Sequence, residues 1–569
     1  PALYVLSITL VAAIGGLIFG FDTAIVAGAT RYMKERFALD SLQEGWAVSV
    51  VLIGCMFGAG LAGPISDRIG RRRFMLVSAV LFLVSAIGCA LPRTITEFVI
   101  FRFIGGLGIG SAAVLSPLYI AEVAPARIRG ALVSVNQLAI VTGIMLAYFV
   151  NWLFAGAGPA NWRWMFGLGA VPSVFFFLLL LRVPESPRWL VKNGREDEAR
   201  TVLTRVESAE AAASGIRDIR DTLALEEGSI RELFRPAFRR PLVLAIVLAV
   251  FQQITGINAI LYYAPRIFEG AGFARMSAIG QSAIVGLCNM IFTLVAIVLA
   301  DKVGRRPLLL VATGGMGISL VLLGAAFKFP FLPASALLFI ILLYIAFFAS
   351  AMGPLVWVVM AEIFPIKVRG SAMGLATLIL WFADFVVTLT FPVISDRFHP
   401  SAAFWLYAVM CAFALGFMWL ALPETKGKTL EEIARRWLKT ARARTKGRSR
   451  SRRRDRDRPP RRRYRYFAAS ASASLRTAMS SSSTRMPDST AGRYWTLRAP
   501  SCSRLSNECR AMVWPVLKSR NSRSMASRPN QTLGLSISSI SRTCDRSVID
   551  GSPWRTSSWT RVKPSFRMR

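Results

Sequence analysis

The sequence DRIGRR at residues 67–72 returns as DKVGRR at residues 301–306, 234 positions further along the chain. AEVAPARIRG at 121–130 returns in the same way as AEIFPIKVRG at 361–370, at an offset of 240 positions. Two long matches at nearly the same offset indicate an internal duplication.

A third, fainter match pairs PESPR at 184–188 with PETKG at 423–427, at an offset of 239 positions. Chance can produce one of these matches but not three in the same order. The motifs therefore predict two homologous halves in parallel orientation. Such halves rock against each other about a central site, which is the alternating-access mode of transport.

Long apolar segments fill the chain between these motifs. Hydrophobic residues make up 54% of the 569 positions, and the mean hydropathy is +0.48, which a water-soluble domain does not sustain over such a length. The segments long enough to cross a bilayer lie near 3–29, 44–66, 75–92, 97–121, 131–155, 163–182, 241–268, 277–300, 307–327, 333–361, 371–394 and 401–422. We therefore predict an all-α polytopic membrane protein with twelve transmembrane helices in two six-helix halves.

The remaining segments complete the predicted domain organisation. The six-helix halves at 1–182 and 241–422 flank a linker at 183–240, which is rich in Glu, Arg and Ala and has helical periodicity. We expect short cytoplasmic helices in this linker, covering the inner mouth. A short cytoplasmic helix is expected at 423–440, and a disordered basic tail rich in Ser and Arg follows at 441–569.

The tail differs abruptly from the rest of the chain. It holds 31 of the 69 Lys and Arg residues but 6 of the 32 Asp and Glu residues, and it has no apolar span. Its run SRSRRRDRDRPPRRRYRY at 449–466 has the charge to attract nucleic acid or anionic lipid. The scattered Trp, Cys and Met residues do not suit a low-complexity tail. Our hypothesis is an out-of-frame extension without a function, and we expect no nucleic-acid partner.

Positive charges between the spans predict the orientation in the membrane. The loops after even-numbered helices carry most of them, at Arg68, Arg71, Arg72, Arg73, Arg127, Arg129, Lys302, Arg305, Arg306, Lys367 and Arg369. By the positive-inside rule, these loops and both termini are cytoplasmic, in the plasma or inner membrane. The loop after the first helix is mixed, with basic and acidic residues at Arg31, Lys34, Glu35, Arg36, Asp40 and Glu44.

Acidic and basic residues recur together at the predicted cytoplasmic helix ends. A Glu ends one helix and an Arg opens the next in each half, Glu122 with Arg129 and Glu362 with Arg369. Ion pairs there would clamp the halves together on the inner side and break when that side opens. The alternative is positive charge that only sets topology. The candidate gate residues are Asp67, Arg71, Arg72, Glu122, Arg129, Glu185, Asp301, Arg305, Arg306, Glu362, Arg369 and Glu424.

A polar stretch interrupts the first predicted helix of the second half, FQQITGINAILYYAP at 251–265. Neutral amides inside a bilayer must find partners or cost free energy. The ITG triplet invites local unwinding at Gly256, which would turn the side chains into a cavity. Helix–helix contact is the alternative reading, but three amides and two tyrosines favour a polyhydroxylated ligand. The polar residues are Gln252, Gln253, Asn258, Tyr262 and Tyr263.

Asp22 lies in the first apolar segment, near the predicted middle of the membrane. A carboxylate there is costly unless it is paired or functional. Arg102, near the start of the fourth segment, is the obvious partner. A static ion pair and a proton-carrying site are both compatible with this pattern.

Family motifs occur in both halves, at GFDTAIVAG (20–28), DRIGRR (67–72), RFIGGLGIGSAAVLSPLYIAEVAPARIRG (102–130), NQLAIVTG (136–143), PESPRWL (184–190), QQITGINAILYYAP (252–265), DKVGRRPL (301–308), GPLVWVVMAEIFP (353–365) and PETKG (423–427). With them the chain resembles the sugar porter family of the major facilitator superfamily over roughly 3–438. This family includes proton-coupled xylose, arabinose and galactose symporters and the facilitative glucose transporters. The resemblance implies the major facilitator fold and a central monosaccharide site.

The implied sugar site combines amides with aromatic rings. The resemblance places there Phe19, Gln137, Gln252, Gln253, Asn258, Tyr262, Asn289, Trp357 and Trp381. Amides suit sugar hydroxyls because they donate and accept hydrogen bonds, and aromatic faces suit the C–H surface of a pyranose.

Three positions depart from the sugar symporter pattern. Ile144 stands where the xylose symporter has Gln, and Leu380 stands where some members have an amide, so a hexose is at least as good a candidate as xylose. Asp384 stands where the family usually places Asn, which adds either a second titratable group or a plain hydrogen-bonding group beside the sugar.

The resemblance implies that Asp22 carries the proton and that Arg102 tunes it, because facilitative transporters have an amide at the first position. We therefore predict a proton-coupled monosaccharide symporter. A facilitative sugar or inositol uniporter and a non-transporting sugar sensor are the alternatives.

Other protein classes find no support in the sequence. There is no P-loop for ATP-driven transport, and nothing indicates an enzyme. The one histidine, His399, and seven scattered cysteines give no metal-ligand spacing. We expect no cofactor and no metal, and a monomer whose partners are a monosaccharide, a proton and the bilayer.

Overall fold

The computed structural model describes residues 2–426, except residues 126, 226–229, 236–237, 330–331 and 365. The predicted tail at 441–569, and the predicted helix at 423–440 beyond residue 426, lie outside the described residues. The described residues form helices and connecting loops, without a β-strand, and twelve helical stretches are long and apolar enough to cross a membrane. The predicted fold class is confirmed.

The first half contains six of these stretches. They are α1 (Ala2–Phe37), α2 (Ser41–Ile69), α3 (Arg71–Ala90), α4 (Ile95–Val123), α5 (Arg129–Phe154), and α6 (Asn161–Gly167) with α7 (Ala170–Leu180). The Asp40 carboxylate caps α2 by accepting from the main-chain N–H of Gln43, and Thr94 caps α4 in the same way through Glu97.

Four short helices occupy the segment between the halves. They are α8 (Pro187–Lys192), α9 (Glu196–Val206), α10 (Ala209–Leu225) and α11 (Ile230–Leu233). The first three share a small core of their own, built on Trp189, Leu190, Val202 and Ile216. The indole of Trp189 also donates to the main-chain carbonyl of Asp67, which ties this small core to the end of α2.

The second half repeats the pattern with more interruptions. Its elements are α12 (Arg239–Ile254), α13 (Ile257–Tyr262), α14 (Ala264–Gly270), α15 (Arg275–Val303), α16 (Arg305–Lys328), α17 (Ala334–Phe347), the π-helical turn η1 (Phe348–Met352), α18 (Gly353–Glu362), α19 (Ile366–Phe398) and α20 (Pro400–Ala421). A π-helical turn inside an α-helix often marks a functional site.

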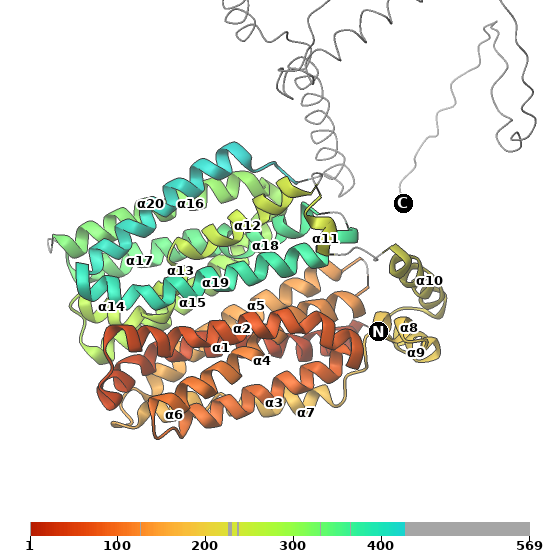
Figure 1. Ribbon diagram of the computed structural model, residues 1–569, viewed down its shortest axis with the longest axis horizontal. Helices are drawn as coiled ribbons and strands as arrows, with labels where there is room; N and C mark the ends of the chain where they lie inside the picture. Colours follow the sequence, from red (N-terminus) through yellow and green to blue (C-terminus); the bar gives the residue numbers. More distant parts are fainter. Residues whose placement is uncertain are drawn as a thin grey trace, which may run out of the picture. The chain divides into compact units, whose positions relative to one another are not determined.

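The helices pack as two bundles that meet along several contacts. Within the first half, α1 packs on α5 and α2 packs on α4, while α16 packs on α20 and α12 on α19 in the second. The halves meet where α2 packs against α19 and α5 against α15 (Figure 1). In Figure 1 the first half runs from red to yellow-orange and the second from yellow-green to cyan.

The predicted break at Gly256 is confirmed. Gly256 has a φ of +93° between the end of α12 and the start of α13, a conformation that glycine adopts at little cost. The ring of Tyr407 from α20 fills the space beside it, so that a Cβ at Gly256 would lie 2.3 Å from the ring. The break turns the polar stretch away from a regular helix.

Candidate functional site

Asp22 of α1 and Arg102 of α4 form an ion pair inside the first half. Arg102 Nη1 lies 2.6 Å from Asp22 Oδ2, and the guanidinium lies 5.6 Å from the centre of the Phe166 ring. Arg102 is fully buried, whereas 18% of the Asp22 side chain is exposed. Arg102 Nε and Nη2 have no hydrogen-bond partner among the described residues. The predicted pairing is confirmed, and its loss would leave a buried cation without a counter-charge.

The polar stretch at the Gly256 break forms a chain of hydrogen bonds. Gln253 Nε2 donates to Gln252 Oε1 at 3.4 Å, and Asn258 Nδ2 donates to Gln253 Oε1 at 2.9 Å. Asn258 Nδ2 also donates to Asp384 Oδ2 at 2.7 Å, which links α13 to α19. Thr388 Oγ1 completes the chain by donating to Asp384 Oδ1 at 3.1 Å.

Gln252 has a second role in the structure. Its Nε2 donates to the main-chain carbonyls of Met352 and Gly353, at 2.9 and 2.8 Å, where η1 passes into α18. The π-helical turn leaves carbonyls available to such a donor. Gln252 therefore couples the broken helix α12–α13 to the interrupted helix that carries Trp357.

Aromatic residues of both halves meet beside this chain. Phe19 of α1 and Trp381 of α19 pack edge to face, with ring centres 5.6 Å apart. Trp381 Nε1 is buried and has no hydrogen-bond partner in the described part of the chain, so it is a donor available to a ligand. Tyr262, the last residue of α13, is buried nearby and lines the cavity described below.

The remaining predicted sugar-binding residues come from other helices. The structure places Gln137 on α5, Asn289 on α15 and Trp357 on α18. Asn289 is buried and Gln137 is half-buried, and the helices that carry them, α5 and α15, pack against each other across the two halves.

The repeated motifs build the same cap in both halves. Glu185 accepts from the main-chain N–H groups of Arg71 and Arg72, which open α3. Glu424 accepts from those of Arg305 and Arg306, which open α16, at 3.1 and 3.0 Å. A carboxylate at a helix N-terminus satisfies unpaired N–H groups and suits the helix dipole.

A glycine before each arginine pair makes room for this cap. Gly70 and Gly304 have φ values of +104° and +109°, and a Cβ at either would lie against the capping carboxylate. Partial burial raises the pKa of Glu424, but main-chain N–H groups, first that of Lys426 and then those of the helix start, hold it below its usual value.

The predicted gate residues pair within each half. Arg71 Nε lies 3.1 Å from Glu122, and Arg305 Nη2 lies 3.2 Å from Glu362. Arg71 also pairs with Asp67 at 2.8 Å. Each of these pairs joins helices of one half, so in this conformation they brace a half and do not bridge the two halves.

The other predicted gate residues contact main-chain carbonyls. Arg72 donates to Leu180 and Leu181, and Arg306 donates to Trp419. Arg129 and Arg369 donate to the carbonyls of Ala124 and Phe364. The Asp301 side chain lies outside the described residues.

Ion pairs between the halves, which the sequence motifs do not predict, occur at the opposite end of the bundle. Glu44 of α2 lies 2.6 Å from Arg266 of α14, and Lys34 lies 3.7 Å from Asp396. We call these residues and their charged neighbours the mouth cluster, which comprises Arg31, Lys34, Glu35, Glu44, Arg266, Glu269, Arg275 and Asp396. The sequence feature that indicates this cluster is the mixture of acidic and basic residues in the loop after the first helix. A loop whose charges only set the topology would carry an excess of one sign.

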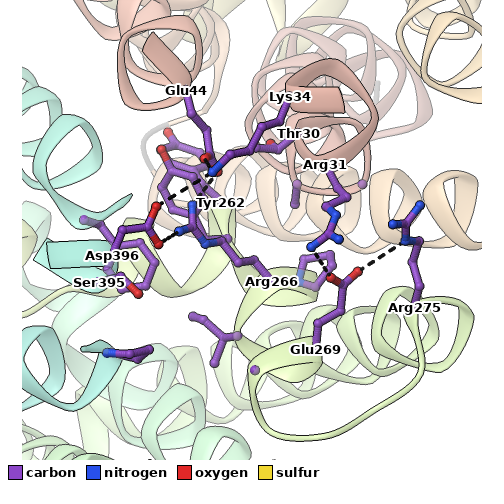
Figure 2. Close-up of a pocket in the computed structure, with 18 of the residues that line it drawn as sticks. Thr30, Arg31, Lys34, Glu44, Tyr262, Arg266, Glu269, Arg275, Ser395 and Asp396 are labelled. Atoms are coloured by element: carbon purple, nitrogen blue, oxygen red, sulfur yellow. Dashed lines mark hydrogen bonds and ion pairs between the residues drawn. The ribbon is translucent and has the colours of Figure 1, made fainter. Parts of the chain in front are cut away.

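The mouth cluster lines a cavity of about 970 Å³ that reaches Tyr262 and Tyr263 (Figure 2). Arg31 pairs with Glu269 at 3.1 Å, and Arg275 pairs with Glu35 at 2.8 Å, so two further pairs join the halves. Glu44 is the most buried member, with 2% of its side chain exposed. The cavity therefore reaches from the charged mouth to the two tyrosines at the end of α13.

In the described part of the chain, twelve helices long and apolar enough to cross a membrane lie in two repeated halves, with polar groups buried where the halves meet, and this arrangement defines a membrane transporter. The chain belongs to the sugar (and other) transporter family, whose model matches residues 8–437.

Curated relatives and solved structures resemble nearly the whole of this transporter region. The chain is 41% identical over 443 residues to the arabinose-proton symporter of Bacillus subtilis, covering 77% of this chain and 96% of that protein. It is 40% identical over 474 residues to the D-xylose-proton symporter of Escherichia coli, covering 76% and 96%. A partially occluded inward-open structure of the Escherichia coli xylose transporter matches with a TM-score of 0.68 at 38% identity, covering 75% and 99%.

Proposed function

We propose that this protein is a proton-coupled monosaccharide symporter that imports sugar by alternating access. The observation that carries the proposal is the buried Asp22–Arg102 pair in one half, facing a chain of amides in the other. A charged pair inside a bilayer is retained for function more often than for stability.

The amide chain supplies the sugar contacts. Gln253 and Asn258 offer both donors and acceptors, which match hydroxyl groups in either role. Trp381 offers an N–H without a partner among the described residues, and a ring that packs against Phe19 of the other half. Sugar held between Phe19 and Trp381 would tie the halves together, with Gln137, Asn289 and Trp357 completing the site.

Proton binding at Asp22 changes the charge balance of the first half. When Asp22 is ionised, it neutralises Arg102 at 2.6 Å. When Asp22 takes a proton, the guanidinium loses its counter-charge, and the half must rearrange to offer Arg102 another acceptor. This links protonation to the state of the half, and Asp22 releases the proton to the cytoplasm after sugar has crossed.

We place the mouth cluster on the extracellular side and the repeated motifs on the cytoplasmic side, with both termini cytoplasmic. Support comes from the positive charge of the loops at 68–73, 127–129, 302–306 and 367–369. In this orientation the pairs of the mouth cluster join the halves on the extracellular side and must break for the outward-open state. The braced pairs at Arg71 and Arg305 keep each half rigid while it rocks.

The substrate class is a monosaccharide. Relatives of 40–41% identity are named for arabinose and D-xylose, and a further relative of 40% identity is named a glucose transport protein. Ile144 and Leu380 are both buried and apolar. This part of the site is therefore less polar than it would be with an amide side chain at these positions.

The test is uptake of labelled D-xylose, L-arabinose, D-glucose and D-galactose into proteoliposomes that contain the full chain, with and without an inward proton gradient. The proposal predicts accumulation of at least one sugar above its external concentration, and only with the gradient. Uptake that never exceeds equilibration would contradict symport and identify a uniporter.

A further inference from the structure

Asp384 of α19 is a second carboxyl inside the membrane, and the Asp22–Arg102 pair does not use it. Its side chain is fully buried. In the described part of the chain it accepts hydrogen bonds from Asn258 Nδ2 and Thr388 Oγ1, and both donors are neutral. The carboxyl therefore ends the amide chain that contacts sugar in the proposed function.

The surroundings of Asp384 and Asp22 are opposite. Asp22 has a guanidinium at 2.6 Å and is partly exposed. Asp384 has no exposed surface and two neutral donors. An ionised carboxylate without a counter-charge is strongly unfavourable in a membrane interior, and such a group takes a proton instead.

Among the described residues, no charged side chain forms an ion pair or hydrogen bond with Asp384. The helices packed against α19 are α2, α11, α12, α13, α18 and α20. The titratable groups of these helices that interact electrostatically with it are Cys55 of α2 and Tyr262 of α13. Both are neutral groups near pH 7. The groups that α12 presents in this chain, Gln252 and Gln253, are neutral amides.

We propose that Asp384 is a second, proton-dependent sugar ligand, which binds sugar as the neutral acid and loses affinity when it ionises. This inference rests on the proposed function of the amide chain. The neutral acid adds an O–H donor to a site whose amides already supply donors and acceptors. The proton enters from water when the cavity is open, and it returns to water when hydration stabilises the carboxylate. No other bond forms or breaks.

The test removes the first proton site and then titrates the second. Asp22→Asn protein in liposomes is assayed for exchange of labelled D-xylose and D-glucose, with equal pH on both sides, from pH 6 to pH 9. The inference predicts that apparent affinity falls by at least about fivefold as pH rises, because the acid ionises. The double variant Asp22→Asn with Asp384→Asn keeps a group of the same size, and its affinity is expected not to change with pH.

A flat pH profile in the Asp22→Asn protein would overturn the inference, whether or not the double variant folds. Equal slopes in the single and double variants would overturn it as well. Infrared spectroscopy gives a second readout, because the C=O stretch of a protonated carboxyl should disappear in Asp384→Asn. Failure of the proposed function is distinguishable, since it would show in the native protein as sugar uptake that never exceeds equilibration under an inward proton gradient.

Discussion

At the scale of single residues, the site depends on groups that each satisfy two partners. Asn258 joins Gln253 to Asp384 through one amide nitrogen, at 2.9 and 2.7 Å. A buried polar group that loses its partner costs more than the mean value of one hydrogen bond. Asn258 is therefore the link between the amides next to the Gly256 break and the Asp384 carboxyl of α19, and its removal leaves both partners without this donor.

Asn258→Ala is expected to weaken sugar binding by about tenfold or more, because an unmade buried hydrogen bond costs about 1–3 kcal/mol. Fluorescence titration of purified protein with D-xylose and D-glucose measures the change. The control is Thr390→Ala, whose hydroxyl donates to the Val386 carbonyl of its own helix. Equal affinity in the Asn258→Ala and native proteins would remove Asn258 from the site.

The sequence alone predicts functional residues where polar side chains interrupt an apolar span. Asp22, Gln252 and Asn258 stood out because polar groups are rare in apolar spans. The partners that their side chains find were not readable. Gln252 donates to carbonyls of Met352 and Gly353, and no local pattern predicts an acceptor 100 residues away.

At the scale of elements, the break between α12 and α13 depends on one glycine and one ring. Gly256 has a positive φ and lies against Tyr407. Gly272 also has a positive φ, +95°, but a Cβ there would meet nothing within 4 Å. Both glycines have a positive φ, but only Gly256 lies against a side chain. Comparing them therefore separates the cost of backbone strain from the cost of the clash with Tyr407.

Gly256→Ala is expected to lower thermal stability more than Gly272→Ala. Both substitutions strain the backbone by about 1 kcal/mol. Gly256→Ala also forces the Tyr407 ring aside, which adds about 1–3 kcal/mol of overpacking. Melting temperatures in detergent measure the difference. Combining Tyr407→Ser with Gly256→Ala replaces the ring by a smaller side chain, and this double variant should recover part of the thermal stability that Gly256→Ala loses. Equal losses at the two glycines would show that Tyr407 does not clamp the break.

Helix number and the Gly256 break were predictable because apolar length and glycine are local signals. Glu185 and Glu424 were predicted as gate residues and not as helix caps. Their carboxylates reach main-chain N–H groups more than a hundred residues away, which sequence spacing does not encode. The repeat identified the right residues, and only the structure shows that they cap helices of their own half.

At the scale of the whole molecule, the ion pairs of the mouth cluster join the two halves. Glu44 and Arg266 form the most buried of them, with side chains 2% and 25% exposed. Burial lowers the pKa of Arg266, but the Glu44 and Asp396 carboxylates raise it by more than that. Its pKa is therefore above the usual value, and the guanidinium stays charged. Arg275 and Glu35 form an exposed pair between the same halves, with side chains 40% and 50% exposed.

Arg266→Gln is expected to favour the conformation in which the mouth is open, because Glu44 then loses its partner in the second half and keeps, among the described residues, its pair with Lys34 of the first half. Loss of a buried partner is worth about 1–3 kcal/mol here, or roughly a five- to hundredfold shift in population. Thiol labelling of Ser395→Cys, in a background with the native cysteines replaced by serine, measures opening of the cavity. Arg275→Gln, which breaks an exposed pair, should change labelling by less than about fivefold. Equal labelling in both variants would argue against a gate at Glu44 and Arg266.

The central claim is that Asp22 couples sugar movement to proton movement, and proton uptake driven by sugar tests it most directly. Sugar is added to lightly buffered, de-energised vesicles that contain the protein, and the external pH is recorded. The native protein should make the medium alkaline as sugar enters, because each sugar carries a proton inward. Asp22→Asn should abolish this change while sugar exchange continues. An alkaline shift that persists in Asp22→Asn, or sugar entry without any pH change in the native protein, would contradict the account.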